Sequence, residues 1–193
     1  MKRTYTISGE RLLHHNIRLA DSTDKLVKEM KKVTSIRGQN RTEADLEKLQ
    51  QLEWFGGLYL NEESRPIIPA KLIDACLING AKRTRGKASK TNTIKTSVRC
   101  VGDNLLIYSG PKTAEELWKD DRFRFRTGAR IGKDIIFRTR PVFNDWKLNF
   151  TLEYDPASIN AEDLDRTVQD AGQYCGLGDW RPQNGTFKVI DIK

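Results

Sequence analysis

The chain has 193 residues, of which 37% are hydrophobic and 31% are charged, and its formal net charge at pH 7 is +8. This size and composition are typical of a soluble globular protein with one well-buried core. The sequence has no apolar run of about 18 residues and no apolar signal core near its N-terminus, so we expect a cytoplasmic protein without a membrane span.

The first predicted element is a strand over residues 2–8, in which Tyr5 and Ile7 alternate with polar residues. His14 and His15 follow it. Because imidazole titrates near neutral pH, one of them could act as a general base. The structural alternative is that one histidine packs in the core and the other is solvated. No orienting acid or nucleophile is evident nearby.

Two helices are predicted next, over residues 24–33 and 42–55. Thr42 begins the second helix with a capping signal. The apolar stripe of that helix comprises Leu46, Leu49, Leu52 and Phe55. We interpret the two helices as an insertion, at about residues 21–57, in a larger fold.

A third helix is predicted to begin near Pro69 and to end in a basic stretch. From Lys82 to Arg99 there are seven Lys or Arg residues and no acid. Ile94 is the one large apolar residue between positions 84 and 96, so this segment cannot bury much surface. We therefore predict a mobile basic insertion at about residues 84–97, with a flexible linker as the alternative.

Two short strands are predicted over residues 98–101 and 105–108, around a turn at Gly102. Thr113 is then predicted to cap a short helix.

The segment from residue 122 to residue 140 has the strongest pattern in the chain. In an extended conformation Arg122, Arg124 and Arg126 share one face, while Phe123 and Phe125 share the other. The alternation returns near residue 138, where two further arginines project together. The segment holds seven Lys or Arg residues and one acid. It predicts a cationic sheet face over an apolar one.

The two basic windows predict a surface for single-stranded nucleic acid, with RNA favoured over DNA. Concentrated positive potential attracts a polyanion, and the planar donors of Arg suit phosphate groups. A solvated basic surface is the simpler interpretation of either window alone. The predicted binding residues in these windows are Lys82, Arg83, Arg85, Lys87, Lys90, Lys95, Arg122, Arg124, Arg126, Arg130, Arg138 and Arg140.

The last predicted elements are a strand over residues 146–154 with one buried face, a helix capped by Asn160, and a strand over residues 187–192. The order of elements is that of a ferredoxin-like fold, an α+β sandwich with helices on one face of an antiparallel sheet. We expect a single domain over residues 1–193 that carries the two insertions.

Common catalytic and metal-binding motifs are absent from the sequence. It contains no phosphate loop, no HExxH and no GxSxG. Cys76, Cys100 and Cys175 are widely spaced and form no CxxC pair, so they indicate small core residues in a reducing compartment. We expect no cofactor and no metal, and a non-catalytic function is favoured.

Three local features carry a family resemblance. They are Ile68-Pro69 before a helix that ends in AlaLysArg, the basic insertion after that helix, and the segment GLGDWRPQNGTFKV before the last strand. With these features the chain resembles the RAMP superfamily of CRISPR-associated proteins, particularly the backbone subunits that coat guide RNA. In that superfamily a glycine-rich loop lies against the RNA backbone, and an inserted thumb hairpin kinks the strand.

The resemblance implies roles for two segments. Gly176, Gly178, Arg181 and Gly185 would belong to the RNA-contacting loop, and residues 82–95 to the thumb region. The family's loop usually ends in a Gly-Arg type sequence, whereas Gly185 is followed here by Thr186. A helix stop followed by a proline turn is the structural alternative for this loop.

Three functions remain open at this point. The first is non-catalytic binding of single-stranded RNA or DNA, with head-to-tail assembly along the strand as in the resembling family. The second is a metal-independent endoribonuclease that uses His14 or His15, as some superfamily members use a histidine. The third is a phage or mobile-element inhibitor that mimics or binds a subunit of a CRISPR effector complex, which leaves defence or counter-defence open. The same arginines could also hold a small nucleotide.

Overall fold

The computed structural model describes residues 1–36, 40–83, 90–132 and 134–193, which divide into two compact units. The first unit comprises Met1–Leu13, Asn61–Ser109 and Phe143–Lys193, and the second comprises His14–Leu60 and Gly110–Val142. The helical insertion predicted at about residues 21–57 falls within the second unit. That the chain is a single domain with insertions stays a prediction.

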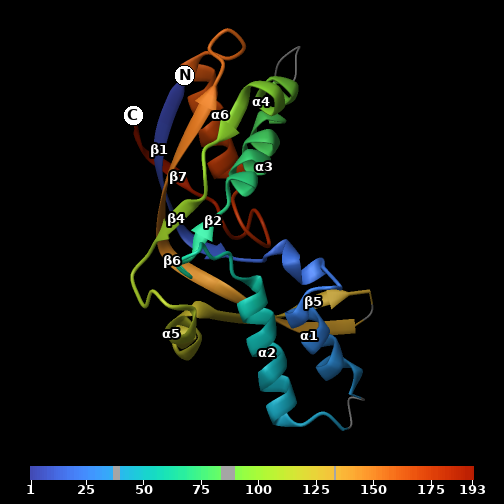
Figure 1. Cartoon of the computed structure of the whole chain (residues 1–193). Coiled ribbons are helices and arrows are strands. Elements are labelled where there is room, and N and C mark those ends of the chain that lie inside the picture. Colours follow the sequence, from blue (N-terminus) through green and yellow to red (C-terminus); the bar gives the residue numbers. More distant parts are fainter. Residues whose placement is uncertain (37–39, 84–89, 133) are drawn as a thin grey trace. The chain divides into compact units, whose positions relative to one another are not determined.

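The first unit is built on an antiparallel sheet with the strand order β2-β4-β6-β1-β7, and β3 also pairs with β6 (Figure 1). Its strands are β1 (Lys2–Leu13), β2 (Ile67–Ile68), β3 (Val98–Cys100), β4 (Asn104–Ile107), the last part of β6 (Asp134–Tyr154) and β7 (Lys188–Ile192). Its helices are α3 (Ala70–Ala81), α4 (Thr91–Ser97) and α6 (Ala161–Tyr174). Because α3 follows β1 and α6 follows β6, the β4-β6-β1-β7 core has ferredoxin-like topology. This confirms the predicted α+β, ferredoxin-like fold class.

The helix-covered face of this sheet is the core of the first unit. The side chains of Trp146, Leu148, Phe150 and Leu152 alternate along β6 and are buried, as their spacing predicted. Each large apolar side chain removed from water in this way stabilises the fold by about 1.5–3 kcal/mol. The opposite face of β6 exposes polar side chains such as Lys147. One face of the sheet is therefore buried, and the other is exposed to solvent.

Helix α6 is fixed to this sheet and to its neighbouring helix by specific contacts. Asn160 caps it by accepting a hydrogen bond from the Asp163 N–H at 2.8 Å, as predicted. Asp165 accepts hydrogen bonds from Arg3 and Tyr5 of β1. A Cβ atom on Gly80 of α3 would lie 2.7 Å from the Cβ of Ala171, so only glycine allows α3 and α6 to pack this closely.

The second unit packs helices around a long hairpin. It contains η1 (Ile17–Ala20), α1 (Lys25–Ser35), α2 (Glu43–Gly57), α5 (Ala114–Lys119), η3 (Asp121–Phe123), β5 (Arg124–Ile131) and the first part of β6. Thr42 and Asp45 form the predicted capping box at the start of α2. The buried Trp54 donates its indole N–H to the Phe123 carbonyl at 2.8 Å. This bond ties α2 to the segment that leads into β5.

The two short strands predicted around the turn at Gly102 are present as β3 and β4. Each of them pairs with β6 rather than with the other: Cys100 lies opposite Leu152 and Leu106 lies opposite Leu148. Because β6 is 21 residues long, it offers pairing positions for both strands. The turn at Gly102 therefore connects two strands that share one partner.

The described part of the predicted basic insertion is a helix rather than a loop, and the mobility of the insertion stays a prediction. Residues 84–89 lie outside the described residues, but Thr91–Ser97 forms helix α4. Ile94 is only 2% exposed and anchors this helix. Ile94 is the buried apolar residue of this short helix, and the ion pair of Lys90 with Asp163 of α6 also holds the segment.

The apolar stripe predicted for α2 is not its buried face. Leu46 is 39% exposed, whereas Glu53 and Trp54 are buried. The physical reason is that Glu53 pairs with the buried Arg140 and the half-buried Arg138 of β6, and no local pattern in the sequence indicates this pairing.

Candidate nucleic-acid interface

The β5–β6 hairpin carries most of the arginines of the second basic window, and its register divides them between two faces. Arg126 lies opposite Thr139, and Thr127 lies opposite Arg138. Side chains of directly opposed residues in an antiparallel pair point to the same face. One face, which we call the outer face, therefore holds Arg124, Arg126, Arg130, Ile135 and Phe137.

The outer face pairs arginines with aromatic rings. The guanidinium carbon of Arg126 lies 4.8 Å from the centre of the Phe137 ring, and that of Arg124 lies 4.7 Å from the centre of the Trp118 ring. Phe137 is 59% exposed, and Arg126 and Arg130 are exposed as well. The outer face thus offers water-accessible cations next to a ring on which a planar group can stack.

Two aspartates neutralise the beginning of this segment. Arg122 donates to both carboxylate oxygens of Asp120, with a closest distance of 2.7 Å, and Arg124 pairs with Asp121. The hydrogen bonds from Arg122 lower the pKa of Asp120 below its ordinary value. Among the residues that the structure describes, Arg126 and Arg130 have no carboxylate partner. The net positive charge of the outer face therefore rests on these two residues.

The prediction that Arg138 and Arg140 project into one cationic surface with the β5 arginines is wrong. Their face is opposite to the outer face, and Arg140 is only 6% exposed. Glu53 of α2 accepts a hydrogen bond from Arg140 at 2.9 Å, one from Arg138 at 3.3 Å and one from the Thr139 N–H at 2.9 Å. Both arginines satisfy a buried carboxylate; Arg140 is itself buried, whereas the Arg138 side chain is 34% exposed. Arg122 also departs from the prediction, because it lies in η3 rather than in an extended strand.

The first basic window is only partly described. Lys82 and Arg83 follow the last turn of α3, where Lys82 contacts Asn79 and Arg83 lies 4.3 Å over the Tyr174 ring. Lys90 pairs with Asp163 of α6, and Lys95 is exposed on α4. Arg85 and Lys87 lie outside the described residues. Lys95 is the cation of this window that points to water from a well-defined helix.

The glycine-rich segment is packed tightly against the chain. Gly176, Gly178 and Gly185 all have φ between +73° and +78°. A Cβ atom on Gly178 would overlap the Leu13 carbonyl oxygen, and one on Gly185 would overlap that of Leu177. The Gly185 N–H donates to the Arg11 carbonyl at 2.7 Å. These glycines are required by the backbone itself, and Arg181 is the exposed cation of the loop.

The two histidines lie in different environments. His14 is fully buried, and burial lowers its pKa to about 3. Its Nδ1 accepts from the Tyr59 N–H at 3.4 Å. His15 is exposed, and its carbonyl accepts from the Tyr59 hydroxyl at 2.9 Å. His14 is thus a neutral core group that cannot reach a substrate, which is the structural alternative stated for it.

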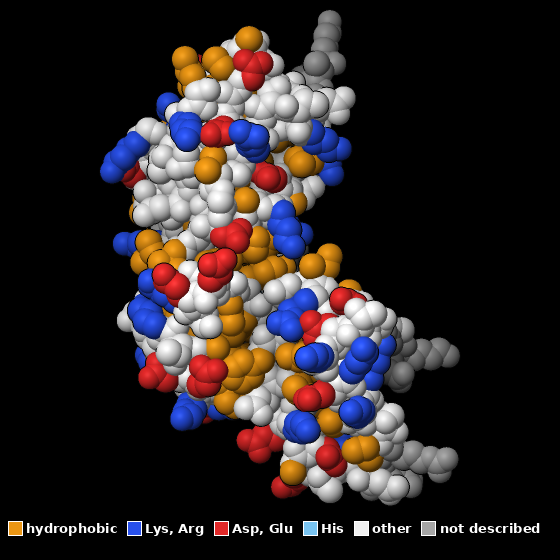
Figure 2. Space-filling view, viewed as in Figure 1, with side chains coloured by type: hydrophobic (Ala, Val, Ile, Leu, Met, Phe, Trp, Pro, Cys, Tyr) orange, Lys and Arg blue, Asp and Glu red, His pale blue; other side chains and the backbone are white. Residues whose placement is uncertain are grey.

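The sequence patterns did not predict the acidic residues that pair with the arginines of this hairpin. Asp120 and Asp121 directly precede the window that begins at Arg122, so extending the count by two residues would have found them. Glu53 had no comparable signal, because it lies 85 residues from Arg138. Figure 2 shows basic and acidic side chains interspersed on the visible side, not gathered in one large patch.

Two absences apply to the part of the chain that the structure describes. Within the four described ranges, no helix is long and apolar enough to cross a bilayer. In the same ranges, no group of three His, Cys, Asp or Glu side chains is arranged to hold a metal ion.

Comparison with known proteins shows the fold and no more. No family model matches the sequence, and no curated protein matches it. Among solved structures, it is similar to a chain in the cryo-EM structure of the Type III-B Cmr-beta bound to cognate target RNA. The TM-score is 0.54 and the identity 13%, over 100% of this chain and 59% of the other. The chain thus spans about three fifths of the length of the chain that it matches.

Proposed function

We propose that this chain is a non-catalytic binding protein for single-stranded RNA, and that the outer face of the β5–β6 hairpin holds the RNA. The observation that carries the proposal is the exposed pair of Arg126 and Phe137, with Arg130 beside it on the same face. Arginine provides charge-assisted hydrogen bonds to phosphate, and an exposed ring stacks on an unpaired base. Both groups are therefore suited to an unpaired strand.

The spacing along β5 supports contact with successive phosphates. Arg124 and Arg126 are two residues apart on one face, so their Cα atoms are separated by about 7 Å along the strand. Arg130 continues the same face towards the end of the hairpin. A strand of nucleic acid laid along β5 would meet Arg126 and Arg130, and it would meet Arg124 in competition with Asp121.

The fold similarity supports RNA as the polyanion. The matching chain belongs to a complex described as bound to cognate target RNA, and the motifs of this sequence resemble the RAMP superfamily. On this basis we propose a CRISPR-related RNA-binding role. Lys95 of α4 and Arg181 of the glycine-rich segment are further proposed contacts, because both are exposed in the first unit. Head-to-tail assembly along RNA stays a prediction.

The test is the salt dependence of RNA binding by an arginine variant. Binding of a fluorescent single-stranded RNA to the full chain is measured by anisotropy over a range of salt concentrations. Arg126→Ala/Arg130→Ala is expected to weaken binding at least tenfold and to reduce the slope of log K against log salt by about 1.4, which is about 0.7 for each lost phosphate contact. An unlabelled DNA of the same sequence, used as competitor, measures the preference for RNA.

A matched control variant has the same net charge as Arg126→Ala/Arg130→Ala. Arg99→Ala/Arg166→Ala also removes two exposed arginines, but both lie in the first unit and one of them already pairs with Glu153. This control is expected to bind nearly as well as wild type. If the two double variants behave alike, binding reflects total charge, and the hairpin is not the site.

A further inference from the structure

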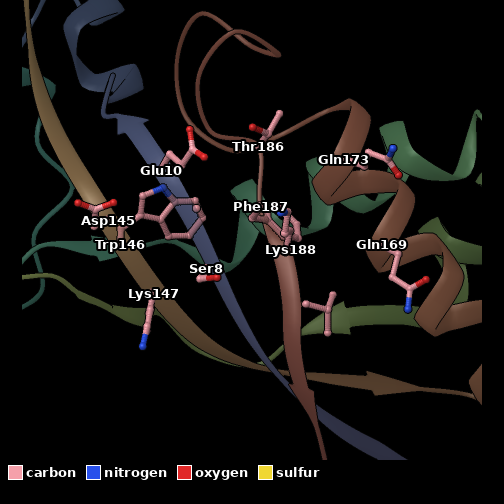
Figure 3. Close-up of a pocket in the computed structure, with 12 residues that line it drawn as sticks. Ser8, Glu10, Asp145, Trp146, Lys147, Gln169, Gln173, Thr186, Phe187 and Lys188 are labelled. Carbon is pink, nitrogen blue, oxygen red and sulfur yellow. The ribbon is translucent and has the colours of Figure 1, made fainter.

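A cavity in the first unit is lined by residues 8–10 of β1, residues 145–147 in the middle of β6, the beginning of β7 and helix α6 (Figure 3). Its volume is about 960 Å³, which is within the range of small-molecule sites. It is separate from the β5–β6 hairpin, because every residue that lines it belongs to the first unit. The charged groups on its wall are arranged in two rows across the strands.

The first row is cationic. Ser8 of β1 lies opposite Lys188 of β7. On the other side of β1, the hydroxyl groups of Thr4 and Thr151 are 2.9 Å apart, so the same antiparallel register puts Ser8 opposite Lys147 of β6. Figure 3 shows Ser8 between the two lysines.

The two lysines can converge on one anion. Adjacent strands are about 4.8 Å apart, so the Lys147 and Lys188 backbones are separated by about 10 Å, a gap that two lysine side chains span from both sides. Both lysines are exposed, and among the described residues neither has a carboxylate partner. A phosphate above Ser8 would receive two ammonium donors and a hydroxyl donor.

The second row is acidic. Glu10 lies two residues beyond Ser8, and Asp145 lies two residues before Lys147, so both carboxylates flank the cationic row. Both are exposed, and neither has an ion-pair partner in the described part of the chain. Asp145 has a φ of +49°, a conformation that is uncommon for a residue other than glycine and that persists only where the surroundings hold it.

Trp146 also lines the cavity, but its side chain belongs to the helix-covered face of β6 and its indole N–H is buried. It is therefore not a donor for a ligand on the face of Lys147. The cations and carboxylates of the cavity remain available instead of satisfying one another.

We infer that this cavity binds a nucleoside phosphate whose base carries an exocyclic amino group. Lys147, Lys188 and Ser8 hold the phosphate, and Glu10 and Asp145 accept hydrogen bonds from the amino group, as carboxylates do from the N4 amino group of cytosine. Uracil has no such group, so the site discriminates cytidine from uridine. This inference does not depend on the function proposed for the hairpin.

The first test compares two matched nucleotides. Binding of cytidine 5′-phosphate and uridine 5′-phosphate to the full chain is measured by isothermal titration calorimetry. Cytidine 5′-phosphate is expected to bind about tenfold more tightly than uridine 5′-phosphate, because uridine lacks the amino group that contacts the carboxylates. Equal affinities would overturn the role of the carboxylates, and a lack of binding by both nucleotides at millimolar concentration would overturn the site.

Variants separate the two rows. Lys147→Ala/Lys188→Ala is expected to weaken the binding of both nucleotides by about tenfold or more. In Glu10→Ala/Asp145→Gly, glycine tolerates the positive φ at position 145. This variant is expected to bind the two nucleotides with about equal affinity and to bind uridine 5′-phosphate as tightly as wild type does. All four positions are exposed, so the variants are expected to fold, and circular dichroism checks this. Unchanged affinities in both variants would overturn the proposal.

A third arm identifies the source of the nucleotide and separates this inference from the hairpin. Arg126→Ala/Arg130→Ala is expected to bind cytidine 5′-phosphate as wild type does. If a cytidine oligonucleotide displaces the mononucleotide and Lys147→Ala/Lys188→Ala weakens oligonucleotide binding, the ligand is a residue of a bound strand. If oligonucleotides do not compete, the ligand is the free nucleotide. Loss of mononucleotide binding in the hairpin variant would overturn the assignment to this cavity.

Discussion

The two faces of the β5–β6 hairpin use the same residue type for opposite purposes. On the outer face, Arg126 and Arg130 are exposed, and Arg126 lies over the Phe137 ring. On the inner face, which we define by Arg138 and Arg140, both side chains pair with Glu53. Arg140 of the inner face is part of the core of the second unit and Arg138 lies half-buried at its edge, whereas the outer pair is exposed.

The difference teaches that cross-strand register, and not local alternation, assigns the arginines. Alternation within β5 or within β6 shows which residues share a face of their own strand. It does not show which face of β5 matches which face of β6. The pairing of Thr127 with Arg138 settles that point.

The largest effect is expected from removing the inner acid. Glu53→Ala removes the carboxylate that pairs with the buried Arg140, and breaking a buried pair in this way lowers the unfolding free energy by about 3–5 kcal/mol. Urea denaturation measures the loss. Glu47→Ala, at an exposed position of the same helix, is expected to change stability by less than about 0.5 kcal/mol. Similar values for the two variants would contradict the contrast between the faces.

A pH dependence is expected next from His14, whose backbone N–H donates to the Pro141 carbonyl beside Arg140. Burial lowers the pKa of His14 to about 3, whereas an unfolded histidine has a pKa of about 6.5. Between these values the unfolded chain binds a proton that the folded chain does not. Stability therefore falls as the pH falls, by about 1.4 kcal/mol per pH unit below 6.5.

His14→Gln isolates this contribution from other titrating groups. Urea unfolding of both proteins at pH 7.5 and pH 4.5 gives the difference between them at each pH. That difference is expected to favour wild type more strongly at the higher pH, by about 2–3 kcal/mol. A difference that does not change with pH would show that His14 is accessible to protons in the folded state.

A smaller effect is expected from the acids that precede the outer face. Asp120→Asn/Asp121→Asn releases Arg122 and Arg124 from their carboxylate partners. The amide introduced at position 120 retains a side-chain oxygen that can cap η3. Because exposed ion pairs are weak, RNA affinity is expected to rise only about two- to fivefold. Anisotropy at low salt measures it. Weaker binding by this variant would mean that the arginines must be held in place by the acids.

The smallest effect is the stability of the outer-face variant. Arg126→Ala/Arg130→Ala removes two exposed side chains, so its unfolding free energy is expected to stay within about 0.5 kcal/mol of wild type. Urea denaturation of this variant beside Arg140→Ala makes the comparison. If both variants lost the same unfolding free energy, the outer arginines would contribute to the core as Arg140 does.

Much of the fold was predictable because its signals are local. The capping residues Thr42, Thr113 and Asn160 begin helices where the sequence places them. The alternation from Trp146 along β6 identified a strand with one buried face. Strand pairing was not predictable in this way: β3 and β4 share β6 as a partner, and no local pattern records which strands meet.

The site was less predictable because it depends on partners that are distant in the sequence. The arginines of the hairpin were found by their spacing, but the burial of Arg140 depends on Glu53, 87 residues away. Lys147 and Lys188 were not identified as a pair, because their proximity exists only through β1. Whether the outer-face arginines bind RNA stays a prediction.

The close packing of the glycine-rich segment bears on how natural variation in this protein should be interpreted. At Gly178 and Gly185 a side chain of any size would collide with the backbone, and the positive φ adds strain. Selection for folding alone is therefore sufficient to preserve glycine there, whatever the loop contacts. Among homologues, variation at Arg181, an exposed position that no packing constrains, would report on selection for ligand binding far more directly than the invariance of its glycine neighbours.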